Sequence, residues 1–197
     1  MIDPMLLHHA EEDFVLTDDW VLELKYDGVR AILDTTGQVK VLYTRRGHEI
    51  HDQFPEIDAP PGLVLDGEIV GFDGEFHKLN WVQRRLGVKG ADKILERSKK
   101  FPITFVAFDI LGIVDPQHDF RSLEFSKRRS MLEALSDEIT VSPVYPASNI
   151  DTMWDYVRKN NLEGLVAKRK DSKYVQGIRT YNWRKIKHSK PEYRSDS

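Results

Sequence analysis

Alternating and continuous apolar runs along the chain predict a series of β-strands. Residues 20–26 alternate apolar and charged side chains, and Asp27-Gly28, a dipeptide typical of hairpin turns, follows them. Residues 101–111 form a longer apolar and β-branched run that is typical of a buried strand. The predicted strands are 20–26, 29–34, 39–43, 63–72, 101–111 and 165–168, with further turns at Thr36-Gly37 and Asp73-Gly74.

Apolar residues at helical spacing occur between these strands. The clearest segment begins at Ile150, after which apolar side chains recur every three or four positions, with Ser148 and Asp151 expected as its N-terminal cap pair. Weaker helical patterns span residues 78–86 and 123–135. Hairpins mixed with helices indicate an α+β domain and not a regular βαβ alternation.

Composition narrows the class of protein only slightly. The chain of 197 residues is 40% hydrophobic and 31% charged, which is enough apolar material for a real core. Its formal net charge of −3 gives no hint of a nucleic-acid partner. The absence of cysteine excludes disulfides and thiolate metal sites. No signal peptide and no membrane-spanning run is found, so we expect a cytoplasmic protein without a membrane partner.

The strongest chemical signal lies in one segment, Glu23-Leu24-Lys25-Tyr26-Asp27-Gly28-Val29-Arg30. It places Lys25 at the end of a predicted strand, immediately before a tight turn, with Arg30 on the returning strand. A strand end holds a side chain rigidly, and the turn leaves space for a phosphate to approach. Taken alone, the same pattern also fits a charged hairpin on the surface.

Further segments, in a fixed order, resemble the motifs of the covalent nucleotidyltransferase superfamily, which contains DNA ligases, RNA ligases and mRNA-capping enzymes. Lys25 to Arg30 resembles the nucleophile motif of that superfamily. The other similar segments are 44–47, 65–68, 105–111, 163–168 and 183–187, with Arg46 standing where asparagine is usual. The resemblance runs from about Pro4 to Lys187, and its last two motifs are most similar to the ligase domains of bacterial end-joining enzymes.

The resemblance implies a fold of two antiparallel β-sheets flanked by helices, with ATP in the groove between them. Lys25 would attack the α-phosphate of ATP, giving lysyl-AMP and pyrophosphate, and the AMP would pass to a 5′-phosphate of nicked double-stranded DNA. A lysine at its ordinary pKa is protonated at neutral pH, so we expect nearby cations to favour the free amine. A metal ion, Lys185 and Lys187 are the expected sources of that positive charge.

The resemblance also implies roles for residues around Lys25. Arg30 and Arg45 would bind the ribose or the α-phosphate through their planar guanidinium groups. Glu68 and Glu163 would receive a ribose hydroxyl or bind Mg²⁺, for which Mn²⁺ could substitute. The remaining expected positions are Glu23 at the adenine amino group, Leu24 at the base edge, Phe108 over the adenine, and a cationic wall of Lys168, Arg179, Lys185 and Lys187.

Each of these residues also has a simpler structural interpretation. Lys25 could form a surface ion pair with Glu23 or Asp27, and the arginines and glutamates could be solvated charges. Phe105 and Phe108 could both pack in the core, although their odd separation along a strand predicts that they face opposite sides. The histidines show no metal-ligand spacing, and His8-His9 is expected to be exposed.

Residues 1–187 are predicted to form an adenylation domain and 188–197 a polar, frayed tail. The tail is too short for the OB-fold domain that ligases of this superfamily normally carry, so that domain is expected to be absent. We therefore expect a monomer that charges Lys25 slowly and seals nicks poorly unless an OB-fold domain or an end-joining partner helps.

Two alternatives from other classes remain open. One is an RNA ligase or an mRNA-capping-type enzyme that uses the same lysine, and the attachment of GMP instead of AMP would favour capping. The other is a non-catalytic nick-binding module, which would keep its activity without the Lys25 amine.

Overall fold

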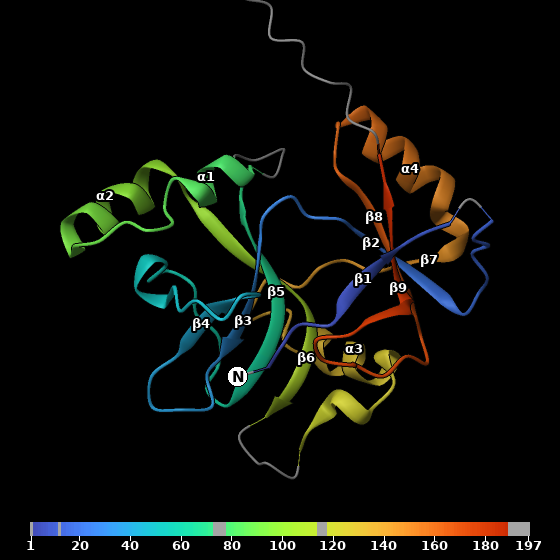
Figure 1. The fold of residues 1–197 in the computed structure, drawn as a ribbon, viewed down its shortest axis with the longest axis horizontal. Coiled ribbons are helices and arrows are strands. Elements are labelled where there is room, and N and C mark those ends of the chain that lie inside the picture. Colours follow the sequence, from blue (N-terminus) through green and yellow to red (C-terminus); the bar gives the residue numbers. More distant parts are fainter. Residues whose placement is uncertain (1, 12, 73–77, 114–117, 189–197) are drawn as a thin grey trace, which may run out of the picture.

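The computed structural model describes residues 2–11, 13–72, 78–113 and 118–188 (Figure 1). The predicted turn at Asp73-Gly74 and nearly all of the predicted tail lie outside these residues. The strands are β1 Leu6–His9, β2 Trp20–Leu24, β3 Val29–Asp34, β4 Val41–Thr44, β5 Leu63–Gly71, β6 Ile103–Ile113, β7 Tyr145–Pro146, β8 Gly164–Arg169 and β9 Arg179–Lys187. The helices are α1 Leu79–Gln83, α2 Ala91–Lys100, α3 Phe125–Glu133 and α4 Ile150–Lys159, with short 3₁₀ turns at His51–Gln53, Phe120–Ser122 and Ala147–Asn149.

The strands form two sheets, which confirms the predicted α+β class. One sheet has four antiparallel strands in the order β4-β3-β5-β6, and the other has five in the order β1-β9-β8-β2-β7. One pair departs from the antiparallel prediction, because β1 runs parallel to β9. Parallel strands cannot be joined by a tight turn, and here the two partners come from opposite ends of the sequence. The five-stranded sheet is therefore mixed.

The prediction that Asp27-Gly28 closes a hairpin is wrong. Strand β2 pairs with β7 and β8, whereas β3 pairs with β4 and β5, so the chain crosses from one sheet to the other at this dipeptide. Gly28 is needed there for a different reason, since a Cβ atom at this position would collide with the carbonyl oxygen of Ile69. Lys25 thus stands between two sheets and not at the tip of a hairpin.

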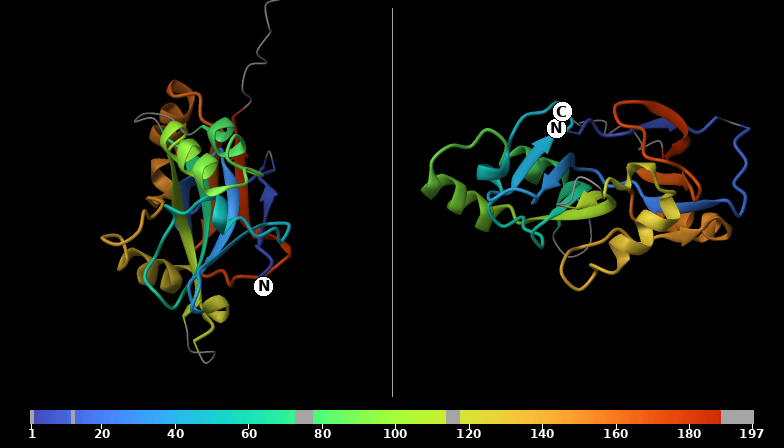
Figure 2. Two further views of the ribbon diagram at one scale, coloured as in Figure 1. Left: turned by 90° about the vertical axis from the view of Figure 1, so that its left-hand side faces the viewer. Right: turned by 90° about the horizontal axis from the view of Figure 1, so that it is seen from below.

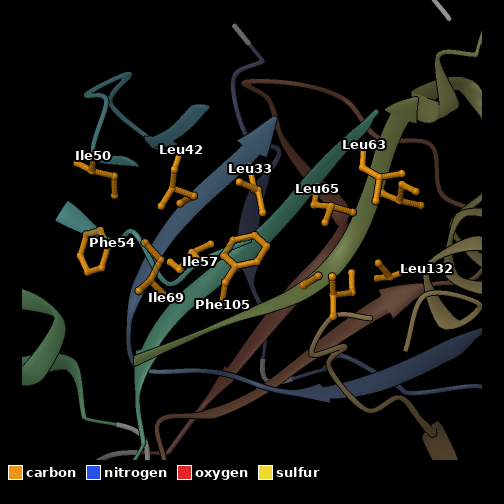
Figure 3. Packing of buried hydrophobic residues seen from close by; sticks show 14 of the residues in the cluster. Leu33, Leu42, Ile50, Phe54, Ile57, Leu63, Leu65, Ile69, Phe105 and Leu132 are labelled. Carbon is orange, nitrogen blue, oxygen red and sulfur yellow. The ribbon is translucent and has the colours of Figure 1, made fainter. Parts of the chain in front are cut away.

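Both faces of the four-stranded sheet are buried. Leu33, Leu65 and Phe105 pack on its outer face in the cluster that Figure 3 draws. Ile32 and Trp183 belong to a second cluster, which joins the two sheets. A third cluster lies between the five-stranded sheet and α4. Packing on both faces fixes the register of these strands, and with it the positions of side chains in the groove between the sheets.

The helices follow their predictions unevenly. Helix α4 covers the predicted segment, but the expected cap pair is wrong, because the N-cap residue is Asn149 and no side chain caps the helix. The 3₁₀ turn Ala147–Asn149 leads directly into α4, so the chain enters the helix already coiled. Helices α1 and α3 are shorter than predicted, and α2, β1, β7 and β9 were not predicted. Among the described residues, no helix has the length and apolar character needed to cross a membrane.

Candidate active site

A hollow opens between the two sheets and takes its lining from both. It encloses about 400 Å³ including its open mouth. Its lining combines apolar rings with charged side chains, namely Leu7, Glu23, Leu24, Lys25, Tyr26, Arg30, Glu68, Phe108, Val166, Lys168 and Trp183. Seven of these were predicted from the sequence as site residues; Leu7, Tyr26, Val166 and Trp183 were not.

Lys25 is held in this hollow by Glu163. Its Nζ donates to Oε2 of Glu163 at 2.6 Å, and its backbone N–H donates to the carbonyl oxygen of Gly164 at 2.9 Å. The Lys25 side chain is only 18% exposed, so it does not form the surface pair with Glu23 that the simpler interpretation required. Lys187 approaches the other oxygen of Glu163 at 3.2 Å. One carboxylate therefore binds two lysines from different motifs.

The two candidate metal-binding carboxyl groups have opposite pKa shifts. Burial raises the pKa of Glu68 to about 8, although the charges of Arg30 and Lys25 oppose this. Burial also acts to raise the pKa of Glu163, but hydrogen bonds and charge from Lys25 and Lys187 outweigh it and leave that pKa below its ordinary value. A cation would favour the ionised form of both groups.

Arg30 is anchored by an acidic residue that the sequence analysis did not single out. Its Nε and Nη2 donate to the two oxygens of Asp66 at 3.0 and 2.6 Å. Asp66 is fully buried and also accepts from the hydroxyl of Tyr174 at 2.6 Å. This pair of hydrogen bonds orients the guanidinium beside the hollow. Any contact between Arg30 and a ribose would therefore have to use the N–H groups that do not bind Asp66.

Phe108 faces the hollow while Phe105 packs in the core, which confirms that the two rings point to opposite sides. The pairing of β6 with β5 is irregular here, since Asp66 opposes Asp109 and Gly67 opposes Ala107, leaving Phe108 between the two pairs. A bulge of this kind re-aims a side chain. The ring of Phe108 meets that of Trp183 edge to face, with centroids 6.4 Å apart.

Glu23 and Lys168 form a buried ion pair at the floor of the hollow. The Nζ of Lys168 lies 2.9 Å from Oε1 of Glu23 and donates to the carbonyl oxygen of Phe108 at 3.2 Å. The other Glu23 oxygen accepts from the hydroxyl of Ser142 at 3.3 Å. Burial raises the pKa of Glu23 and lowers the pKa of Lys168, and their mutual attraction opposes both shifts. Lys168 thus stands beside Phe108 and Glu23, separate from the pair of lysines on Glu163.

Further cations gather at the edge where β1 lies along β9. Arg179 donates to the carbonyl oxygen of Leu7, and Lys185 is paired in register with His9. The pKa of Lys185 is lowered by burial and then by the charges of Lys187, Arg179 and Lys25. His9 is exposed, as expected, but His8 is only partly exposed because its ring packs on that of Tyr181. The place of His9 beside Lys185 was not predicted, because nothing in LLHH signals a parallel edge strand.

Arg45 does not line the main hollow. It borders a second, shallower hollow together with Arg46 and His48. Arg30 lines both hollows and so connects them. Among the described residues, no group of three or more His, Cys, Asp or Glu side chains could hold a metal ion. Glu68 and Glu163 are hard oxygen ligands of the kind Mg²⁺ accepts, and water or phosphate oxygens would have to complete the shell.

Comparison with known proteins identifies the family of this chain. The family model of the ATP dependent DNA ligase domain matches residues 4–187. The chain is 31% identical over 194 residues to the SPbeta prophage-derived DNA ligase-like protein LigB of Bacillus subtilis, covering 94% of this chain and 67% of LigB. It is 33% identical over 196 residues to the multifunctional non-homologous end joining protein LigD of Mycolicibacterium smegmatis, covering 93% of this chain but only 23% of LigD.

A solved structure has the same fold and an informative ligand. The mycobacterial DNA ligase D complexed with ATP and MES superposes with a TM-score of 0.71 at 27% identity, covering 95% of this chain and 60% of that chain. The family match spans both sheets and every residue of the hollow. The chain belongs to the family of ATP-dependent DNA ligase domains, and its likeness to the ligase domains of bacterial end-joining enzymes is confirmed.

Proposed function

We propose that the chain captures AMP from ATP as a covalent adduct on Lys25 and passes it to a DNA 5′-phosphate for nick sealing in repair. The observation that carries the proposal is the position of Lys25, which lines the hollow between the two sheets and whose amine is held by a carboxylate. The related mycobacterial ligase D structure with ATP supports ATP as the nucleotide.

In the first step, a bond forms between Nζ of Lys25 and the α-phosphorus, and the bond from that phosphorus to pyrophosphate breaks. Glu163 already accepts a hydrogen bond from this amine, so it is placed to take the proton that the amine loses. Lys187 on the same carboxylate lies where it can meet the phosphate charge. Bound Mg²⁺, with Glu68 and Glu163 among its ligands, would offset the remaining negative charge of the ATP phosphates.

The floor of the hollow favours adenine over guanine. A carboxylate is only an acceptor, and adenine presents an amino donor where guanine presents a carbonyl acceptor. Glu23 would therefore accept from the adenine amino group, while Phe108 stacks on the base. Guanine in the same orientation would place its O6 acceptor against the carboxylate, so the contact favours adenine in that orientation. Leu24, which also lines the hollow, would contribute an apolar contact to the base.

The basic edge at β1 and β9 is where we place the DNA phosphates near the nick. Arg179 and Lys185 lie there with His9, at the rim of the hollow. Phosphate contacts position a duplex without reading its sequence, so binding should weaken steeply with salt.

Nick sealing with labelled DNA tests this function. A duplex with a 5′-labelled phosphate at a nick is incubated with the chain, Mg²⁺ and either ATP or GTP. We expect adenylated or sealed strands with ATP only, and none from Lys25→Ala. Equal product from Lys25→Ala would contradict the proposal. Nick binding without product, the same in the unmodified chain and in Lys25→Ala, would support the non-catalytic module, and product from GTP would support the capping alternative. An otherwise identical nicked RNA duplex, sealed faster than DNA, would favour the RNA ligase.

A further inference from the structure

The segment that leads into and includes α2 carries an excess of positive charge that the whole chain does not show. Residues 84–100 contain seven basic and two acidic residues, whereas the complete chain has a formal net charge of −3. The segment is therefore strongly cationic, whereas the rest of the chain has a net negative charge. Helix α2 lies at the end of the molecule opposite to β1 and β9 (Figures 1 and 2).

Six of these seven cations have no acidic partner among the described residues. The exception is Arg85, which is buried and pairs with Glu56. Within the described ranges, no carboxylate lies within ion-pair distance of Arg84, Lys89, Lys93, Arg97, Lys99 or Lys100. We call these six residues the basic arm.

Part of the basic arm is arranged as a surface. Lys93 and Arg97 are four residues apart, so they lie on one side of α2 about 6 Å apart along its axis, and Lys89 lies just before the start of the helix. All three line one shallow hollow outside the sheets. Like charges at this spacing repel one another and destabilise a helix slightly. An anion in the hollow would remove that repulsion.

An aromatic ring holds the base of the basic arm in place. Phe101 is buried, and its ring centre lies 5.3 Å from Cζ of Arg84, 5.7 Å from Cζ of Arg97 and 5.8 Å from Nζ of Lys100. No residue of α2 is itself buried, and an isolated helix of ten residues is marginal in water. These contacts restrict the cations before any partner arrives.

We propose that the basic arm is a second DNA-binding surface, which holds the phosphate backbone of the duplex away from the nick. The inference rests on the proposed function, since it takes the same DNA as its partner. Four of the six residues that line the hollow are charged, three of them basic with the acidic Glu96 beside them, and Leu95 is the large apolar side chain that α2 exposes. A protein interface would need an apolar centre, whereas phosphate contacts need only accessible cations.

The test compares two variants with the same loss of charge. Lys93→Gln/Arg97→Gln alters the basic arm, and Lys127→Gln/Lys159→Gln, on α3 and α4, is the matched control. Binding to a long nicked duplex is measured by fluorescence anisotropy over a series of salt concentrations. The arm variant should lower the slope of log K against log salt by about 2, and affinity at low salt by roughly ten-fold, because two phosphate contacts are lost. The control should keep the slope of the unmodified chain.

Lysyl-AMP formation without DNA is measured on the same samples, and both variants should retain it. An unchanged salt slope in the arm variant, or an equal fall in the control, would overturn the proposal. Failure of the proposed function looks different: the unmodified chain would form no lysyl-AMP, while the salt slopes would still report on the basic arm.

Discussion

Charged side chains are organised in opposite ways in the hollow and in the basic arm. In the hollow, Lys25 binds Glu163, Lys168 binds Glu23 and Arg30 binds Asp66, and each of these cations is largely buried. In the basic arm, the cations are mostly exposed and have no carboxylate partner among the described residues. Paired buried charges fix the geometry of a small ligand site, whereas unpaired exposed charges suit a long polyanion. The difference indicates two surfaces with separate tasks.

The largest effect should come from breaking the buried pair at the floor of the hollow. Lys168→Met leaves the Glu23 carboxylate buried without its cation, which should lower the free energy of unfolding by about 3–5 kcal/mol. The measurement is urea denaturation followed by circular dichroism. The double variant Glu23→Gln/Lys168→Met should recover at least half of the loss. A loss below about 1 kcal/mol in the single variant would mean that the pair is hydrated, and the contrast with the basic arm would fail.

The second effect concerns the carboxylate that holds Lys25. Glu163→Gln keeps the shape of the side chain but removes the charge that binds Lys25 and Lys187, so the rate of lysyl-AMP formation should fall about 100-fold. Single-turnover labelling with ATP measures the rate, and Glu138→Gln, on an exposed loop, serves as the control. A rate within three-fold of the unmodified chain, roughly 0.6 kcal/mol, would show that Glu163 has no part in the chemistry.

A third prediction concerns Glu68, because burial raises the pKa of this carboxyl group to about 8. An acid whose folded-state pKa exceeds its unfolded value stabilises the fold at low pH, and this contribution is lost as the pH rises through the folded value. Without Mg²⁺, the melting temperature should therefore fall from about pH 5 to about pH 8 and level off above that, by roughly 2–4 °C for each kcal/mol lost. Glu68→Gln should flatten that decline. An equally steep decline in Glu68→Gln would assign it to other groups.

The smallest effect is expected on the basic arm. Leu95 is 55% exposed, so Leu95→Gln should change the free energy of unfolding by no more than about 0.5 kcal/mol. DNA affinity should also stay unchanged, because the surface binds through charge. Chemical denaturation and anisotropy measure the two quantities. A marked fall in DNA affinity, with stability kept, would mean that α2 binds through an apolar contact.

Local patterns were sufficient for several of the strands that line the site, but not for β1 and β9. The boundaries of β3 were predicted from its apolar pattern and those of β5 and β6 nearly so, and the motif around Lys25 identified the residue that the hollow encloses. The opposite facing of Phe105 and Phe108 followed from strand periodicity alone.

The remaining features depend on contacts between distant segments. Asp27-Gly28 has the composition of a hairpin turn, but packing against Ile69 turns it into a crossing between sheets. β1 has no strand pattern of its own and is defined by its pairing with β9, so the place of His9 could not be foreseen. The boundary of the predicted adenylation domain at residue 187 and the roles of individual site residues stay predictions.

Intact mass spectrometry after incubation with ATP and Mg²⁺ tests the central claim most directly. We expect a single added adenylyl group, mapped by peptide analysis to Lys25 and absent from Lys25→Ala. An unmodified mass, or an adduct mapped to Lys168, Lys185 or Lys187 in place of Lys25, would contradict it.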